Sequence, residues 1–294
     1  MNKVGFIGVG IMGKSMVRNL MKAGFELHIY ARTKSKVEDV IGEGAQFHES
    51  IKDCVQDCDA VITIVGFPQD VEEVYFDQVN ILDSAKEGAY LIDMTTTSPQ
   101  IAEKIYEEGT KRGFHVMDAP VTGGDTGAKA GTLSILVGGE KEDYEACMPL
   151  FEAMGTNINY QGKAGCGQHC KLANQIMIAG TLSGVCEALT YAKEQGLDPE
   201  VFMKSVATGA AGSKQLDTFG PKILKDDYAP GFFMKHFIKD MKLALIEANR
   251  KGLSLDVLSM VLANYEELEQ EGYGDLGTQA LMKFYDEEHR NMEE

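Results

Sequence analysis

The sequence of 294 residues predicts an α/β domain over residues 1–162, followed by an all-α domain over residues 163–294 that a long helix joins to it. In the first part, short apolar and β-branched runs such as 60–65 alternate with helix-like patterns, as parallel strands buried on both faces do. A helical pattern without proline then runs from 164 to 195, and strand signals stop after it. The length is enough for two separate hydrophobic cores.

The first part reads as strands separated by helices and turns. Its expected strands are apolar runs at 4–7, 25–30, 60–65, 90–93, 115–118, 132–137 and 158–160. Its clearest helices follow the first strand, begin at Pro99 after an N-capping Ser98, and cover 141–154. In the second part, apolar residues recur every three or four positions, which predicts further helices at 201–206, 237–248 and 257–268.

The opening strand runs into a glycine-rich turn, G-V-G-I-M-G. Strand, glycine turn, helix and strand is the order that places a pyrophosphate at a helix N-terminus. We expect Gly8 to make the tight turn, Gly10 to let the backbone approach phosphate oxygens, and Gly13 to let the helix pack closely on the strand. With Ile11 and Met12 between them, these glycines predict a Rossmann-type dinucleotide-binding domain.

The end of the second strand indicates which dinucleotide binds. An NAD site usually has an acidic residue there, about 20 residues after the turn, which binds the ribose 2′-hydroxyl. This chain has Ala31 instead, and its first acids, at 38 and 39, are expected on a helix surface. The residues that follow Ala31 can hold a 2′-phosphate: Arg32, Thr33 and Lys36. The sequence therefore favours NADP, with NAD as the alternative cofactor; a solvated basic loop is the other interpretation of these charges.

Further candidates follow the ends of other expected strands, where ligands bind in open α/β sheets. Val65 ends one strand, and Thr95 and Thr96 follow another, so we expect both hydroxyls to face the cofactor. Farther on, the loop Thr122-Gly123-Gly124 can point successive N–H groups in one direction and so bind a carboxylate. A simple Gly-Gly turn is the alternative.

The candidate acid or base is Lys171, in the first turns of the long helix. A lysine stands out in so apolar a segment, because only its aliphatic stem favours burial. Desolvation would lower its pKa below the usual ~10.4 and make it a usable proton donor or acceptor. Asn174 lies three residues farther on and therefore on the same face of the helix. A lysine that extends along the surface to water is the alternative.

Composition argues against several classes of function. The net charge of −17 disfavours nucleic acid, whose phosphates require a basic face. We find no basic amphipathic stretch, signal-peptide pattern or apolar run near ~18 residues, and therefore expect a cytoplasmic protein that binds no membrane. The six cysteines suit reduced thiols; Cys54/Cys58 and Cys166/Cys170 are expected helical neighbours, and no metal site is predicted. The apolar helical part favours a homodimer or homotetramer.

Five motifs in order resemble the β-hydroxyacid dehydrogenase family, which includes 3-hydroxyisobutyrate dehydrogenase, tartronate semialdehyde reductase and glyoxylate/succinic semialdehyde reductases. They span nearly the whole chain: G-F-I-G-V-G-I-M-G, D-M-T-T-T-S-P, D-A-P-V-T-G-G, G-x-x-x-K-L-A-N-Q and I-K-D. The resemblance implies an NADP-preferring enzyme that transfers hydride between nicotinamide and the β-carbon of a small carboxylate. The implied substrates are of the 2-hydroxy-3-oxopropionate or 3-hydroxyisobutyrate type.

The resemblance also implies roles for individual residues. Lys171 matches the catalytic acid/base, the 122–124 loop matches the carboxylate site, and Asn174 or Gln175 matches the amide that orients the substrate. Thr122 departs from the serine of most members, since it keeps the hydroxyl and adds a methyl group. The remaining matches contact the cofactor or frame the cleft around it: Thr96, Lys239 and Asp240.

Alternative functions remain open at this point. A glyoxylate or succinic semialdehyde reductase would use the same frame, although segments 133–137 and 209–217 resemble tartronate semialdehyde reductase more. A 6-phosphogluconate dehydrogenase shares the architecture, but it needs basic residues for a distal phosphate and a longer helical part. From a different class, a non-catalytic NADP-binding sensor or scaffold has no need for Lys171.

Overall fold

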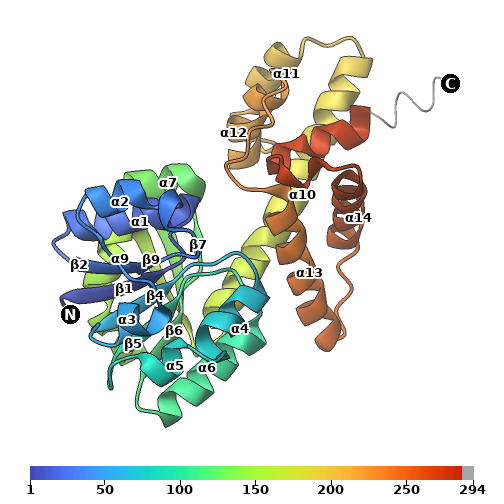
Figure 1. Ribbon diagram of the computed structural model, residues 1–294. Helices are drawn as coiled ribbons and strands as arrows, with labels where there is room; N and C mark the ends of the chain where they lie inside the picture. The colour runs from blue at the N-terminus through green and yellow to red at the C-terminus, as the bar shows by residue number, and fades with distance from the viewer. Residues whose placement is uncertain (287–294) are drawn as a thin grey trace. The chain divides into compact units, whose positions relative to one another are not determined.

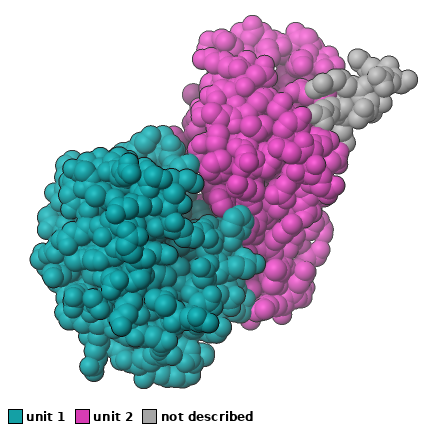
Figure 2. Space-filling view, in the orientation of Figure 1, with its two compact units in different colours: residues 1–171 teal, residues 172–294 magenta. Residues whose placement is uncertain are grey.

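The structure, a computed structural model, describes residues 1–286. It contains two compact units, residues 1–171 and 172–294, which Figure 2 shows in different colours. The first unit is α/β and the described part of the second is helical. Helix α10 (Cys166–Glu194) begins in the first unit and continues into the second. The predicted fold class, a Rossmann-type domain followed by an all-α domain with a long helix joining them, is therefore confirmed.

A single sheet forms the centre of the first unit, with strand order β3-β2-β1-β4-β5-β6-β8-β7 and with β9 paired to β8 (Figure 1). From β3 to β6 all neighbours are parallel, and β8 runs antiparallel to β6. The parallel strands are β1 (Lys3–Ile7), β2 (Glu26–Tyr30), β3 (Gln46–Phe47), β4 (Ala60–Thr63), β5 (Tyr90–Asp93) and β6 (His115–Asp118). The remaining strands are β7 (Val121–Thr122), β8 (Leu133–Gly139) and β9 (Gly155–Gly162).

Helices cover both faces of this sheet, because its strands are apolar on both sides. One face packs against α1 (Ile11–Lys22), α2 (Glu38–Gly42), α7 (Gly124–Ala130) and α9 (Met148–Met154). The opposite face packs against α3 (Ile51–Val55), α4 (Pro68–Phe76), α5 (Ile81–Ser84) and α6 (Pro99–Lys111). The short elements η1 (Lys34–Lys36) and α8 (Lys141–Ala146) complete the unit.

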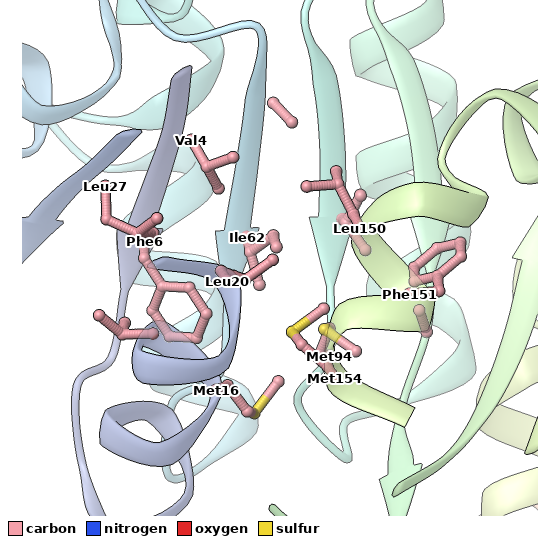
Figure 3. Close-up of a cluster of buried hydrophobic side chains, with 14 of the residues drawn as sticks. Val4, Phe6, Met16, Leu20, Leu27, Ile62, Met94, Leu150, Phe151 and Met154 are labelled. Carbon is pink, nitrogen blue, oxygen red and sulfur yellow. The ribbon is translucent and has the colours of Figure 1, made fainter. Parts of the chain in front are cut away.

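The core on the α1 side fixes where the glycine turn lies. Figure 3 shows Phe6 of β1 beside Leu20 and Met16 of α1, with Phe151 of α9 farther along the sheet. These four side chains are fully buried. Burying one such side chain contributes about 1.5–3 kcal/mol, so the start of α1 is held firmly against the end of β1.

Several expected elements differ in their limits. The strand expected at 60–65 ends at Thr63, because the N–H of Val65 donates to the Thr95 hydroxyl, at 2.9 Å, and not to a neighbouring strand. The helix expected at 141–154 is two helices that meet at Cys147, since Pro149 lies in the first turn of α9 and cannot continue a helix from before. The last strand is longer than the expected 158–160.

The second unit packs its helices around one core. Besides α10 they are α11 (Pro199–Val206), α12 (Lys214–Ile223), α13 (Met234–Arg250), α14 (Asp256–Gln270), η2 (Tyr273–Asp275) and η3 (Thr278–Leu281). Helix α12, which contains Pro221, was not predicted. By length and composition alone α10 could cross a membrane, but one such helix is weak evidence, because the core helix of a helical domain has the same composition.

Candidate active site

The glycine turn at the end of β1 has the geometry that a phosphate site requires. Gly8 has φ +97°, and a Cβ there would lie 2.1 Å from the carbonyl oxygen of Ile64. A Cβ on Gly13 would lie 2.1 Å from the carbonyl oxygen of Gly8. Both positions therefore exclude a side chain, one through its conformation and both through close approach. A Cβ on Gly10 would meet nothing within 4 Å, so the space beside Gly10 is open.

The N-terminus of α1 opens onto that space. Gly10 is its N-cap residue, no side chain caps the helix, and the first turn contains no acidic residue. Ile11 is 58% exposed and Met12 is partly buried. Uncapped N–H groups and the positive end of the helix dipole suit a pyrophosphate. The residues present therefore fit a dinucleotide cofactor, as the sequence predicts.

The end of β2 carries the predicted 2′-phosphate residues on exposed backbone. The guanidinium of Arg32 lies 3.1 Å from the Asp70 carboxylate at the start of α4, and the Arg32 side chain is 72% exposed. Thr33 precedes η1, and Lys36 ends that turn as an exposed residue. The Asp39 carboxylate forms ion pairs with Lys14 and Arg18 of α1, both at 2.7 Å, and so is not placed to bind a ribose hydroxyl. No acidic residue occupies positions 31–33 at the end of β2.

At the ends of β4 and β5, the structure separates the two threonines that were expected to face the cofactor. Thr95 is 1% exposed, and its hydroxyl accepts the N–H of Val65 at 2.9 Å. That hydroxyl belongs to the interior, so the expectation that Thr95 faces the cofactor is wrong. The side chain of Thr96 is partly exposed, as a cofactor contact requires.

Beneath these threonines lies a buried carboxylate. One oxygen of Asp93 accepts the Thr63 hydroxyl at 2.7 Å and the Thr95 N–H at 3.1 Å. Its other oxygen, within the described residues, has no hydrogen-bond partner. Burial raises the pKa of Asp93 to about 6, against the opposing effect of the bonds from Thr63 and Thr95.

The predicted carboxylate loop connects β7 to α7. Thr122 is the last residue of β7, opposite Ser134 of β8, and it is partly exposed. Gly123 and Gly124 are exposed and have φ +129° and φ +64°. A Cβ on Gly124 would meet nothing within 4 Å. The structure thus shows consecutive left-handed residues beside open space, a backbone shape that only glycine adopts readily.

The first turns of α10 carry Lys171, whose side chain is largely buried, with the residue 7% exposed. The helix start is held by Asp118, at the end of β6, whose carboxylate accepts the N–H of Gly165 at 2.7 Å and that of Gln168 at 2.8 Å. Burial raises the pKa of Asp118, and these two bonds oppose the shift. A Cβ on Gly167 would lie 2.4 Å from the carbonyl oxygen of Leu136, so this approach requires glycine.

The remaining predicted residues form a polar chain inside the helical unit. Asn174 donates to the side-chain oxygen of Gln175 at 2.8 Å, and the Gln175 amide donates to Asp240 at 2.7 Å. Lys239 lies 3.1 Å from the other oxygen of Asp240, which is fully buried. Gln175 is 1% exposed, and these two hydrogen bonds satisfy both the oxygen and the nitrogen of its buried amide.

Neither Asp118 nor Gln168 was predicted to belong to the site, although they lie inside the motifs D-A-P-V-T-G-G and G-x-x-x-K-L-A-N-Q. Their contacts join residues about fifty positions apart, 118 with 165 and 168, and no periodicity reports such a contact. The available signal was glycine: Gly138 and Gly167 both lie where a Cβ would collide with Asp118 or its neighbours. Two glycines in otherwise regular elements indicate a close approach of backbone segments.

Comparison with known proteins gives consistent matches over both units. Residues 3–162 match the family described as the NAD binding domain of 6-phosphogluconate dehydrogenase. Residues 165–285 match the family described as NAD-binding of NADP-dependent 3-hydroxyisobutyrate dehydrogenase. The chain is 50% identical over 282 residues to the oxidoreductase YkwC of Bacillus subtilis, with 96% of this chain and 98% of that protein covered.

Two further proteins connect the chain to a named activity. It is 44% identical over 281 residues to the Arabidopsis thaliana protein named "Probable 3-hydroxyisobutyrate dehydrogenase-like 1, mitochondrial", with 95% of this chain and 84% of that protein covered. The solved structure of Mycobacterium tuberculosis 3-hydroxyisobutyrate dehydrogenase with L-serine superposes with a TM-score of 0.88 at 26% identity, covering 96% of this chain and 98% of that chain.

The fold, the phosphate turn and these matches define a nicotinamide-dependent oxidoreductase that acts on CH–OH groups. The chain belongs to the β-hydroxyacid dehydrogenase family.

Proposed function

We propose that the protein is an NADP(H)-preferring β-hydroxyacid dehydrogenase or semialdehyde reductase, with Lys171 as its acid/base. The observation that carries this proposal is the placement of Lys171, which is 7% exposed on the first turns of α10. Lys171 lies three residues after Gln168 on this helix. The Gln168 side chain forms hydrogen bonds with the backbone on both sides of Thr96. A buried amine on the helical turn that bonds to this proposed cofactor-binding segment is suited to proton transfer.

The preference for NADP rests on the end of β2. Arg32 offers a planar pair of donors that matches a phosphate, and its ion pair with the Asp70 carboxylate supports this role. Thr33 and Lys36 add a hydroxyl and a charge on the same exposed segment. Residues Gly8, Gly10 and Gly13, with the N-terminus of α1, would hold the pyrophosphate.

Substrate binding is assigned to the loop at 122–124 and to Asn174. The carboxylate would lie on the N–H groups of this loop, with the Thr122 hydroxyl beside it. Asn174, one turn beyond Lys171 on α10, would orient the reacting oxygen. Gln175 would hold Asn174 in place through the bond of 2.8 Å, and Lys239 and Asp240 would support the cofactor side.

The bound nicotinamide supplies or accepts the hydride. In the direction of reduction, Lys171 donates a proton to the carbonyl oxygen as that oxygen gains charge. In the direction of oxidation, the neutral amine of Lys171 takes the proton from the hydroxyl group. The substrate thus exchanges its proton with Lys171 and its hydride with the nicotinamide, and the protein contributes orientation and proton transfer.

The proposed substrates are small acids with an oxygen on the carbon β to the carboxylate. L-serine, present in the M. tuberculosis structure, and 3-hydroxyisobutyrate, named in two relatives, share that feature. The methyl group of Thr122 would narrow the part of the substrate site that binds the carboxylate. This favours three-carbon acids of the 2-hydroxy-3-oxopropionate type. A glyoxylate or succinic semialdehyde reductase is the alternative within the same family.

A second copy of this chain is the proposed partner. Apolar side chains on four helices of the second unit are exposed, among them Met177 (74%) and Tyr191 (67%) of α10 and Val257 (59%) of α14. Exposed apolar side chains in such number favour burial in a homodimer or homotetramer. The mass of the protein in solution, measured by light scattering, tests this assembly; a monomer would contradict it.

The test of the function is a substrate panel assayed with both cofactors. It contains 2-hydroxy-3-oxopropionate, 2-methyl-3-oxopropionate, succinic semialdehyde and glyoxylate, with L-serine and 3-hydroxyisobutyrate for the oxidation direction. We expect the highest kcat/KM for a three-carbon 3-oxo acid with NADPH. The methyl ester of 3-hydroxyisobutyrate is the matched control, because it lacks the carboxylate charge and adds only a methyl group. Equal turnover of acid and ester, or no turnover at all, would contradict the proposal.

A further inference from the structure

The side-chain amide of Gln168 makes two hydrogen bonds to one backbone segment. Its oxygen accepts the N–H of Thr97 at 3.0 Å, and its nitrogen donates to the carbonyl oxygen of Thr95 at 2.7 Å. A backbone N–H can meet only the oxygen of the amide, and a backbone carbonyl only its nitrogen, so the orientation of the amide is fixed. Gln168 is fully buried, and these bonds flank Thr96 on both sides.

The main chain at Gln168 is fixed as firmly as its side chain. Its N–H donates to Asp118 at 2.8 Å, and the neighbouring Gly167 lies where any Cβ would strike the Leu136 carbonyl. Three independent contacts thus hold the residue: two through the amide and one through the backbone. Lys171 follows three residues later on the same helix, so the position of its Cα relative to the 95–97 segment is set by these contacts.

We infer that Gln168 is a positioning residue that sets the place of Lys171 relative to the cofactor-binding segment around Thr96. This inference rests on the proposed function, in which Lys171 moves the proton and Thr96 contacts the cofactor. Gln168 touches neither substrate nor cofactor in this assignment, and it acts through the two residues that do. Misplacement of a reacting group by about 1 Å can lower the rate about 10²-fold.

The chemistry of the contact provides a specific test. The segment requires one donor and one acceptor at the end of the side chain. In Gln168→Glu an ionised carboxylate keeps the bond to Thr97 but places a second acceptor against the Thr95 carbonyl. A protonated carboxyl restores both bonds, because its O–H can donate to that carbonyl. Burial raises the pKa of such a carboxyl above its usual ~4.3, so this change falls within the working range of pH.

Three variants are compared with the wild type between pH 5.5 and 8.5. Gln168→Glu can regain both bonds in acid, whereas Gln168→Met can regain neither. Gln279→Glu is the matched control: Gln279 is also fully buried, and its amide donates to the backbone carbonyls of Asp227 and Ala229, at 2.9 and 3.1 Å, in the helical unit. For each variant we would measure kcat, the Kd of NADP⁺ by calorimetry, and the unfolding temperature.

We expect kcat of Gln168→Glu to be about 10²-fold below wild type at pH 8.5 and to approach wild type as the pH falls. Its Kd for NADP⁺ should rise at high pH in parallel. Gln168→Met should be slow at every pH, and Gln279→Glu should lose thermal stability without a new pH dependence of kcat. A role in folding alone would lower stability in all three variants without the recovery of kcat in acid.

The inference is overturned if folded Gln168→Glu and Gln168→Met keep kcat and Kd within about twofold of wild type, or if Gln279→Glu shows the same recovery in acid. Failure of both Gln168 variants to fold while Gln279→Glu folds also overturns it, because the residue would then serve folding and not positioning. If the wild type reduces no acid of the panel, the proposed function fails, and the pH dependence of the NADP⁺ Kd still decides whether Gln168 holds the cofactor-binding segment.

Discussion

The carboxylate of Asp118, at the end of strand β6, accepts the backbone N–H of Gln168 at 2.8 Å in the first turn of helix α10. The other oxygen of Asp118 accepts the N–H of Gly165 at 2.7 Å. A helix normally satisfies such N–H groups with a nearby capping side chain. Here the cap comes from the sheet, so the start of α10 has one position relative to the strand ends.

Replacement of Asp118 by asparagine should destabilise the first unit. One of the two N–H donors would then face the NH₂ group of the amide, which cannot accept a hydrogen bond. A buried donor left without a partner costs about 1–3 kcal/mol, so Asp118→Asn should lower the free energy of unfolding by that amount in urea titrations. Asp57→Asn, at an exposed position, is the control. Equal stability of the two variants would show that the cap is unimportant.

Two substitutions in the glycine turn should have different effects, one on stability and the other on cofactor binding. Gly13→Ala would place a methyl group 2.1 Å from the Gly8 carbonyl oxygen, so we expect the free energy of unfolding to fall by about 1–3 kcal/mol or more, as in overpacked cores. Gly10→Ala adds a methyl group where nothing lies within 4 Å, so the protein should fold normally. Its methyl group would occupy the phosphate space, and the Kd of NADP⁺ should rise at least about tenfold. Unchanged binding by Gly10→Ala would place the pyrophosphate elsewhere.

Arg32 should decide the preference between the two cofactors. Arg32→Asp removes the phosphate-binding guanidinium and adds a carboxylate that can bind a ribose 2′-hydroxyl. We expect kcat/KM with NADPH to fall by about 10²-fold, while kcat/KM with NADH is maintained or rises. Arg112→Asp is the control, since Arg112 is also a surface arginine that pairs with an aspartate, Asp83. An unchanged ratio of the two cofactors in Arg32→Asp would refute the assignment of the 2′-phosphate site.

Asp93 should make stability depend on pH with a defined sign. Its pKa is raised to about 6 in the folded protein, so between about pH 4 and 6 the folded state holds a proton that the unfolded state has released. The free energy of unfolding from this group is therefore greatest in acid and declines as the pH rises through 6. Asp93→Asn keeps an oxygen for Thr63 and Thr95 and does not titrate.

The quantity to measure for Asp93 is the difference in unfolding free energy between the wild type and Asp93→Asn, at intervals from pH 4 to 8. From pH 4 to 8, we expect the unfolding free energy of Asp93→Asn to rise relative to that of the wild type by roughly 1–3 kcal/mol. A difference that does not change with pH would mean that Asp93 stays ionised when buried.

Most of the fold could be predicted because its signals are local. The buried parallel strands are continuous apolar runs, and Gly8, Gly10 and Gly13 mark a turn whose geometry follows from the absence of side chains. The break at Cys147 also has a local signal, because Pro149 lies in the first turn of α9, although the apolar pattern continues across it. Helix α12 was not predicted, because Pro221 lies inside it and an internal proline normally indicates that a helix ends.

The contacts around Lys171 could not be predicted in the same way. The Thr95 hydroxyl faces inward because Val65, thirty positions earlier, donates to it. Gln168 meets Thr95 and Thr97 across more than seventy positions. Periodicity reports which face of an element is apolar, but it does not report which polar groups from distant segments meet.

Replacement of Lys171 tests the central assignment most directly. Lys171→Met keeps most of the apolar stem and removes the amine. Lys163→Met, at an exposed position just before α10, is the matched control. We predict that Lys171→Met binds NADP⁺ with a Kd within about threefold of wild type, while kcat with the preferred acid falls at least about 10²–10⁴-fold and the control stays active. A Lys171→Met enzyme with wild-type kcat would contradict the account.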